Sequence, residues 1–150
     1  MRLRLAGTAM ILVLATVLFW PIPFAAAPKW EVWVVDEVGA PLEGMAVRLH
    51  YQNYSAETTG SEMDAVTDSQ GYAQFPMQRA SASAARYIVY SCRSAMAGVH
   101  ASFGRHAGVF AYGQGRDGSA TTGDAITDWT GSPQEIQSRI VARQRPRLVR

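Results

Sequence analysis

Only one cysteine and one lysine occur among the 150 residues, and the sequence lacks the short motifs of several enzyme classes. A single thiol, Cys92, excludes an internal disulfide. Because Cys92 ends the apolar run of residues 87–92, we expect it to be buried as a small apolar side chain; a reactive thiol and an intermolecular bridge are the alternatives. The absence of a Gly-x-Ser-x-Gly motif and of a phosphate-binding glycine loop excludes the hydrolases and nucleotidases that depend on them.

Acidic side chains are absent from the end of the chain. The formal net charge of +2 combines seven basic and twelve acidic residues in 28–138 with five arginines and no acid in 139–150. We therefore expect an acidic body and a basic tail that is either solvated or in contact with an anionic surface. No aromatic residue lies between these arginines, so no nucleic-acid partner is expected. The arginines of the tail are Arg139, Arg143, Arg145, Arg147 and Arg150.

Charged residues are also absent from residues 5–28, which follow Arg2 and Arg4. A basic start before a long apolar run predicts an export signal in residues 1–27. Small residues at 25–27 suit a signal peptidase, whereas Pro28 hinders cleavage. A cleaved signal peptide and an uncleaved transmembrane anchor through residues 5–24 therefore both remain open. Either route places the rest of the chain outside the cytoplasm, anchored at the membrane or, after cleavage, secreted or periplasmic.

Short alternating strands separated by turn residues are the pattern of the body, residues 28–115. This pattern predicts an all-β protein folded as a single antiparallel sandwich. We expect strands at residues 30–35, 46–54, 65–67, 71–75, 86–93, 98–103 and 109–112. We expect a core that contains Val32, Val34, Val47, Leu49, Phe75 and Val89.

Two Asp-x-x-Gly segments, residues 36–39 and 68–71, each come between strands. An Asp carboxylate can accept hydrogen bonds from the N–H groups of a turn, and Gly can adopt the positive φ that closes it. We therefore predict that Asp36 with Gly39, and Asp68 with Gly71, form structural turns.

Residues 34–49 and 66–75, which contain these turns, resemble the carboxypeptidase regulatory-like domain family. The resemblance extends over about residues 30–112 and implies a transthyretin-like (prealbumin-like), Ig-type β-sandwich. Members of this family commonly serve as non-catalytic modules of surface or exported proteins, so the resemblance implies no catalytic residue and no cofactor. A ureide-hydrolysing group shares the fold, but its Tyr-Arg-Gly-Ser ending is absent here, where the chain ends Arg147-Leu148-Val149-Arg150.

The C-terminal part changes in composition. Residues 116–131 are rich in Gly, Ser, Thr and Asp, which predicts a Gly-rich linker. Ser132, Pro133 and Glu135 then have the spacing of a helix N-terminus with a capping box, so residues 132–150 are expected to form a short capped helix followed by the basic tail. Ile136 and Ile140 would share one face of that helix.

Few residues suggest a metal or catalytic site. Cys92, Met96 and His100 are spaced by four, and His100 and His106 would lie at the two ends of a hairpin. We expect these four residues to be structural or exposed and to hold no metal, and we expect His50 to be a surface residue. Residues 117–128 contain oxygen ligands, Asp117, Ser119, Thr121, Asp124 and Asp128, but lack the order of an EF-hand loop, so a solvated loop is expected there.

The sequence therefore predicts an exported, non-catalytic β-sandwich module that acts in binding or assembly at the cell envelope. Its partner would be an unidentified envelope protein or polymer, with membrane contact through residues 5–24. The alternative is a small exported metal-binding protein or hydrolase on the same fold, using His100, His106 or residues 117–128.

Overall fold

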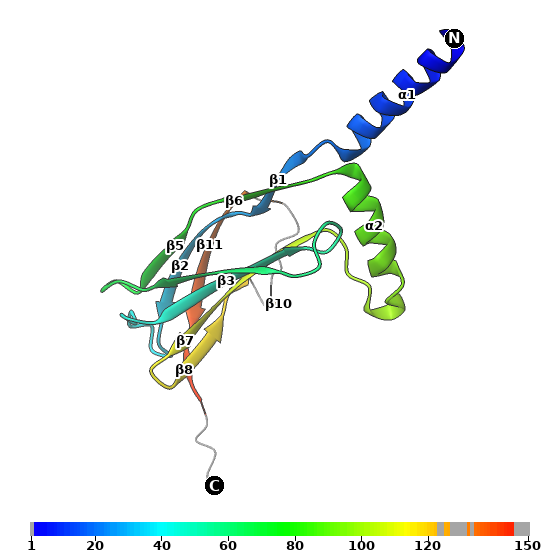
Figure 1. Cartoon of the computed structure of the whole chain (residues 1–150). Coiled ribbons are helices and arrows are strands. Elements are labelled where there is room, and N and C mark those ends of the chain that lie inside the picture. Colours follow the sequence, from blue (N-terminus) through cyan, green and yellow to red (C-terminus); the bar gives the residue numbers. More distant parts are fainter. Residues whose placement is uncertain (1, 123–124, 127–131, 133, 146–150) are drawn as a thin grey trace.

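Two β-sheets that pack face to face make up the body of the protein, and α1 extends away from one end of it (Figure 1). The computed structural model describes residues 2–122, 125–126, 132 and 134–145, and the side chains of 6–120, 132 and 134–145. The described elements are α1 (Arg2–Phe19), β1 (Ile22–Ala27), β2 (Lys29–Val35), β3 (Ala46–Asn53), β4 (Ser61–Val66), β5 (Tyr72–Phe75), β6 (Gln78–Ala82), α2 (Ala84–Ala95), the 3-10 helix η1 (Gly98–His100), β7 (Arg105–Gly113), β8 (Arg116–Ser119), β9 (Thr121–Thr122), β10 (Ala125–Ile126), β11 (Glu135–Val141) and β12 (Arg143–Gln144).

The two sheets have different topologies. The larger sheet has five antiparallel strands in the order β12-β8-β7-β3-β4. The smaller sheet has the order β11-β2-β5, and β11 runs parallel to β2 while β5 runs antiparallel. Further two-stranded pairs join β1 with β6 and β9 with β10. The protein is thus mostly β, as predicted, but its smaller sheet is mixed and not purely antiparallel.

The hydrophobic core lies between the inner faces of the two sheets. In β2, Trp30, Val32 and Val34 are buried, and in β3 the buried residues are Val47 and Leu49. Alternate residues point to opposite faces of a strand, so each strand contributes one apolar face to this interior. Of the six core residues predicted, five are buried, and only Val89 is not.

Both Asp-x-x-Gly turns form as predicted. Asp36 Oδ1 accepts hydrogen bonds from the N–H groups of Val38 and Ala40, at 3.0 and 2.8 Å. Asp68 Oδ1 accepts equivalent bonds from Gln70 and Tyr72, at 2.8 and 3.0 Å. Gly39 and Gly71, which close the turns, have φ values of 90° and 69°.

Residues 86–93, predicted as a strand, belong to α2. Ser83 caps the helix by accepting a hydrogen bond from the Arg86 N–H at 3.2 Å. Val89 and Cys92 are consequently exposed, so the predictions that both are buried were wrong. Residues 98–103 do not form a strand either, because they begin with η1. An apolar run of this length fits a helix as well as a strand, and here the cap and the alanines before it favour the helix.

The C-terminal helix predicted from Ser132 is a strand, β11, in the described residues. Ile136, Ser138 and Ile140 are buried, and the residues between them are exposed, which is the period of a strand. Ile136 and Ile140 are four apart, a spacing that fits both periods, and the edge of β2 supplies a backbone partner along the whole of β11. The predicted linker contains β8, β9 and β10, whereas residues 123–124, 127–131 and Pro133 lie outside the described residues.

The described side chains of α1 are largely in contact with solvent. Its apolar residues Ile11, Val17 and Phe19 are each about two-thirds exposed. In the part of the chain described here, no helix combines the length and the apolar character needed to cross a membrane.

Gly71→Ala tests the second turn against a matched control. A Cβ at Gly71, where φ is 69°, would lie 2.4 Å from the Val34 carbonyl oxygen, whereas at Gly115, where φ is 72°, no atom lies within 4 Å. Both substitutions place an L side chain at positive φ, but only the first also clashes. We expect Gly71→Ala to lower the free energy of unfolding by more than about 2 kcal/mol and Gly115→Ala by about 1 kcal/mol, measured by urea denaturation. Equal losses would contradict this account of the turn.

Candidate functional site

The outer face of the five-stranded sheet carries a connected group of charged side chains. Along β3, Val47 and Leu49 point into the core, so Arg48 and His50 point outward. The register of β3 with the edge strand β4 places Asp64 opposite Arg48 and Glu62 opposite His50. Two basic residues and two carboxylates therefore face one another across neighbouring strands, an arrangement that stabilises paired strands.

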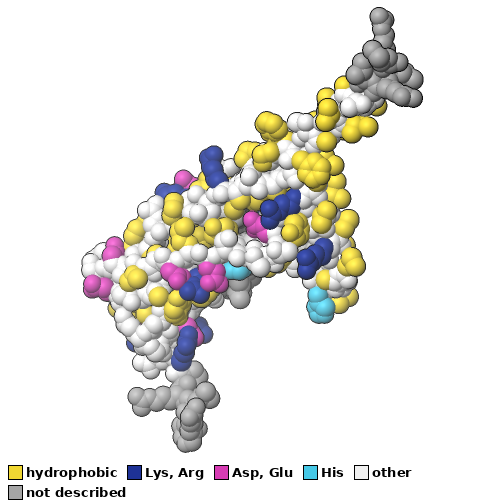
Figure 2. Space-filling view, viewed as in Figure 1, with side chains coloured by type: hydrophobic (Ala, Val, Ile, Leu, Met, Phe, Trp, Pro, Cys, Tyr) yellow, Lys and Arg dark blue, Asp and Glu magenta, His cyan; other side chains and the backbone are white. Residues whose placement is uncertain are grey.

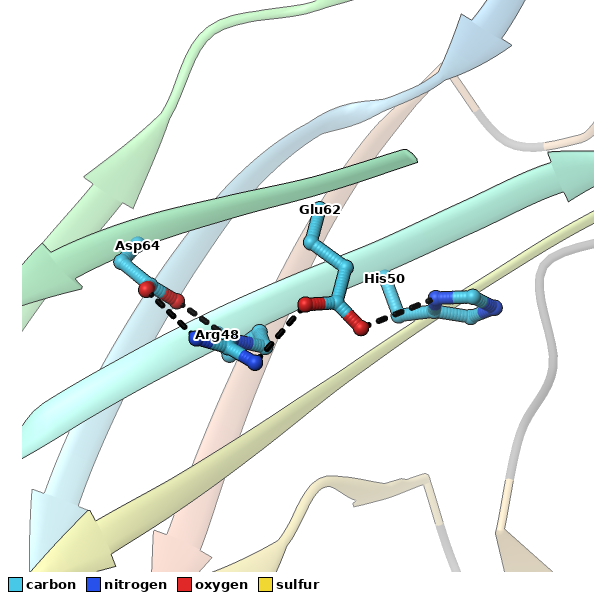
Figure 3. Close-up of polar contacts among 4 residues, drawn as sticks. All are labelled: Arg48, His50, Glu62 and Asp64. Atoms are coloured by element: carbon cyan, nitrogen blue, oxygen red, sulfur yellow. Dashed lines mark hydrogen bonds and ion pairs between the residues drawn. The ribbon is translucent and has the colours of Figure 1, made fainter. Parts of the chain in front are cut away.

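These four side chains form a connected charge cluster (Figure 3). Arg48 donates two hydrogen bonds to Asp64, from Nε to Oδ1 at 2.7 Å and from Nη2 to Oδ2 at 2.8 Å. Its Nη1 lies 2.7 Å from Glu62 Oε2, and the other oxygen of Glu62 lies 3.8 Å from His50 Nδ1. The guanidinium also lies over the Tyr112 ring, with Cζ 5.8 Å from the ring centroid. We call this group, Arg48, His50, Glu62 and Asp64, the charge cluster.

Within the cluster, Arg48 and Asp64 shift each other's pKa. The hydrogen bonds from Arg48 lower the pKa of the Asp64 carboxyl below its ordinary value, and the same bonds raise the pKa of Arg48. Both side chains remain partly exposed, with 31% of Arg48 and 51% of Asp64 accessible to solvent. Solvent therefore screens the pair, and the cluster remains available to a ligand.

A cleft of about 330 Å³ adjoins the cluster at His50. It lies over Gly108, which is opposite His50 in the register of β3 with β7 and has no side chain to fill the space. His106 lies at another wall of the cleft, where its Nε2 is 2.8 Å from the Phe103 carbonyl oxygen and its ring packs against Tyr54 at 5.1 Å. The remaining lining residues include Ser102, Phe110, Ser119 and Ala120.

A second hollow, of about 400 Å³, continues along the same face. Phe110 and Ser119 line both hollows, and Tyr112, Asp117 and Arg145 line only the second. The rings of Phe110 and Tyr112 lie 6.0 Å apart at an interplanar angle of 33°. The face thus offers aromatic surface, hydroxyls, imidazoles and charges of both signs, which can hold a polar ligand longer than one hollow.

The structure does not assemble the candidate metal residues into one site. Cys92 and Met96 are one turn apart at the end of α2, His100 lies in η1, and all three are exposed. His106 instead lines the cleft together with His50. Among the described residues no group of three or more His, Cys, Asp or Glu is placed to hold a metal ion.

The acidic segment 117–128 also differs from a cation-binding loop where it is described. Asp117 lies in β8 and its Oδ2 is 2.6 Å from Arg145 Nε. Asp124 and Asp128 lie outside the described residues. Of the basic tail, Arg139, Arg143 and Arg145 belong to or follow β11 and β12, and Arg147 and Arg150 lie outside the described residues.

Sequence reasoning treated His50 as an isolated surface residue and did not connect it with Glu62. Both residues belong to strands that were expected in part, but β4 begins at Ser61, four residues before the predicted strand. The alternation of charges at positions 48, 50, 62 and 64 was the available signal. A hairpin register that paired these residues would have indicated the cluster.

Comparison with known proteins assigns the chain to no family. No family model matches the chain, and no curated protein matches it. Among solved structures, the chain is similar to 3-chlorocatechol 1,2-dioxygenase from Rhodococcus opacus 1CP, with a TM-score of 0.45 and 14% sequence identity. The match covers 80% of this chain and 61% of the dioxygenase, so this chain spans about three-fifths of that protein.

The dioxygenase is an enzyme, which contradicts the prediction that this chain is not one, and that prediction is withdrawn. At this identity and TM-score the likeness does not transfer the dioxygenase reaction to this chain.

Asp64→Asn tests the charge cluster through its pH dependence. Because the folded-state pKa of Asp64 is lowered, the carboxylate stabilises the fold above its ordinary pKa, and this contribution is lost as the pH falls through the folded-state value. We expect the melting temperature of the wild type to exceed that of Asp64→Asn near pH 6 and the difference to shrink as the pH falls below the ordinary carboxyl pKa of about 4. Glu37→Gln, at an exposed position in the turn after β2, serves as the control. The difference in melting temperature between the wild type and this variant should change less with pH. A difference for Asp64→Asn that is independent of pH would contradict the assignment.

Proposed function

We propose that the chain is an exported β-sandwich protein that is held at the membrane through residues 5–24, which include most of α1, and acts in binding or assembly at the cell envelope. The observation that carries the proposal is the exposure of α1. Met10, Ile11, Leu12, Val13, Leu14, Val17, Phe19 and Trp20 are all exposed. A run of apolar side chains that no part of the described body covers is stable in a lipid environment. Arg2 and Arg4 before the run favour an orientation with the body outside the cytoplasm.

The position of β1 supports an uncleaved anchor over a cleaved signal. β1 directly follows α1 and pairs antiparallel with β6, and Ala26 and Ala27 are buried. The Ala25 carbonyl oxygen accepts a hydrogen bond from Arg105 at 3.3 Å, and Phe24 packs against Tyr87. Cleavage after Ala27 would remove this strand and leave β6 without its partner. We therefore propose that α1 and β1 remain attached to the body.

The outer face of the five-stranded sheet is the surface we assign to the envelope ligand. Its two hollows share Phe110 and Ser119, so a ligand that occupies both must be extended, as a polymer or a protein segment is. The charge cluster at one end and Asp117 with Arg145 at the other offer hydrogen bonds of both polarities. The finer fold assignment, a transthyretin-like sandwich of the carboxypeptidase regulatory-like type, belongs to this proposal and is supported by the two Asp-x-x-Gly turns.

Membrane attachment is tested by fractionation of cells that make the full chain. We expect the protein to sediment with membranes and to resist extraction by high salt, because an inserted apolar helix is not held by charge. Leu12→Lys with Leu14→Lys should release it, whereas Val38→Lys, at an exposed apolar position in the turn after β2, should not. A C-terminal reporter that is active only in the cytoplasm should remain silent; strong reporter activity would refute export.

A second candidate function, a small exported metal-binding protein or hydrolase, is favoured by the cleft that brings two imidazoles together. It predicts that the full chain binds about one equivalent of Zn²⁺ and that His106→Ala weakens this binding at least about tenfold. His100→Ala, which removes an imidazole that does not line the cleft, is the matched control and should bind as the wild type does. Isothermal titration measures both. Saturable binding that depends on His106 would favour this candidate over the first.

A further inference from the structure

One side of α2 is apolar and faces away from the body. Its members recur three and four positions apart, which places them on one face of a helix. Ile88, Val89 and Met96 are 58%, 61% and 87% exposed. The face consists of Ala85, Ile88, Val89, Cys92, Ala95 and Met96, and we call it the α2 stripe.

The opposite side of α2 holds the helix to the body through polar and aromatic contacts. The Tyr87 hydroxyl accepts a hydrogen bond from Asn53 Nδ2 at 3.0 Å, and its ring packs against Phe24. Ser94 Oγ donates to the Ser102 carbonyl oxygen. At the flank of the helix, between its two sides, Arg86 is exposed while its Nε donates to the Ala56 carbonyl oxygen at 2.6 Å. A surface helix of a globular protein ordinarily turns its apolar side to the core, and α2 has the reverse arrangement. The α2 stripe therefore requires an apolar partner outside the body.

The charged residues of α2 itself are both basic. Residues 69–116, which include α2, contain arginines and histidines but no Asp or Glu. Arg86 and Arg93 flank the stripe and are exposed. Glu57 lines a pocket with Arg93 on the body side of the helix, where its carboxylate accepts the Asn53 N–H. In Figure 2 the surface of α2 is correspondingly yellow and dark blue.

Continuity with α1 identifies the partner. α1 and α2 contact each other, and both lie at the same end of the body (Figure 1). If α1 lies in a membrane, the stripe lies next to the lipid. Arg143 of β12 does not lie next to the lipid, because β12 pairs with β8, which lies at the opposite end of the body from α1.

We propose that α2 rests on the surface of an anionic lipid membrane, with the α2 stripe at the boundary between headgroups and acyl chains. Arg86 and Arg93 then meet lipid phosphates, which replace the acids that this part of the chain lacks. The inference rests on the proposed membrane attachment through α1. A second copy of the chain is the poorer occupant, since a symmetric contact between two stripes brings Arg86 and Arg93 against their own copies with no acid between them.

Cys92 makes the test direct, because the only cysteine of the chain lies in the stripe. A fluorophore on Cys92 of the full-length protein is measured in vesicles that carry nitroxide-labelled lipid. Two sets of vesicles are compared, phosphatidylcholine alone and phosphatidylcholine with phosphatidylglycerol. Cys92→Ser with Gln74→Cys places the probe on an exposed site of β5 as the control for water. Cys92→Ser with Ala15→Cys places it on α1 as the control for insertion.

We expect the lipid nitroxide to quench the Cys92 probe severalfold more than the probe at position 74 in vesicles with phosphatidylglycerol, and less strongly without it. Ile88→Ser with Val89→Ser, at two exposed positions, and Arg93→Gln should each reduce the quenching. A Cys92 probe as accessible to water as the probe at position 74 overturns the inference. If the probe at position 15 is nonetheless quenched, the proposed attachment through α1 survives that result. Equal quenching of the Cys92 probe in vesicles with and without phosphatidylglycerol overturns the preference for anionic lipid. Cys92–Cys92 crosslinking in lipid-free detergent overturns the proposal that lipid covers the α2 stripe and indicates a second copy of the chain instead.

Discussion

The parallel pairing of β11 with β2 is the constraint on which the rest of the fold depends. β2 is the centre of the smaller sheet, so its second edge must be closed by another strand, and β11 pairs with it from Lys29 to Val35. A buried hydrogen bond at 2.9 Å from Trp30 Nε1 to Ser138 Oγ gives the indole N–H a partner, which it would otherwise lack in the apolar core. After Ala142 the same segment continues as β12 and pairs with β8 of the larger sheet. One C-terminal segment therefore connects the two sheets, and it positions the second hollow by bringing Arg145 to Asp117.

Cross-strand register builds the outer face in the same way. The pairing of β3 with β4 brings together charges that are 16 or 12 residues apart in the sequence, and the pairing of β3 with β7 sets a glycine opposite His50. Gly60 adds to this, since a Cβ there would lie 2.4 Å from His50 Cε1 and would push the imidazole away from its place. The energetic value of partly exposed ion pairs is small, so the cluster contributes little to stability, and the role that we propose for it is recognition of the ligand. Its position beside an unfilled cleft is the reason why we propose this face as the binding surface.

The two ends of the molecule also differ in the kind of side chain that they expose. At one end, the described part of α1 exposes apolar side chains and α2 exposes apolar and basic ones, whereas Asp36, Glu37 and the acids of β4 belong to the turns and sheets of the body. A membrane at the first end leaves the outer face of the five-stranded sheet free for a ligand, and it leaves β12 directed away from the lipid. In this arrangement the basic residues of α2 lie near the lipid and Arg143 of β12 lies away from it, a difference that the net charge of the chain does not show.

The sequence by itself determined the features that are local. The Asp-x-x-Gly turns formed as predicted because the carboxylate accepts hydrogen bonds from the N–H groups of its own turn and a glycine three positions later adopts the positive φ that closes it. The alternation in β2, β3 and β5 likewise placed Val32, Leu49 and Phe75 in the core. Tertiary structure decided the rest. Residues 135–141 form a strand because the edge of β2 provides backbone hydrogen-bond partners for them. The apolar residues of α2 face outward because Tyr87 and Ser94, on the other side of the helix, form hydrogen bonds with the body. The pairing of His50 with Glu62 likewise exists only in one hairpin register. Composition and periodicity cannot distinguish these outcomes, because each depends on which distant backbone or side chain is available as a partner.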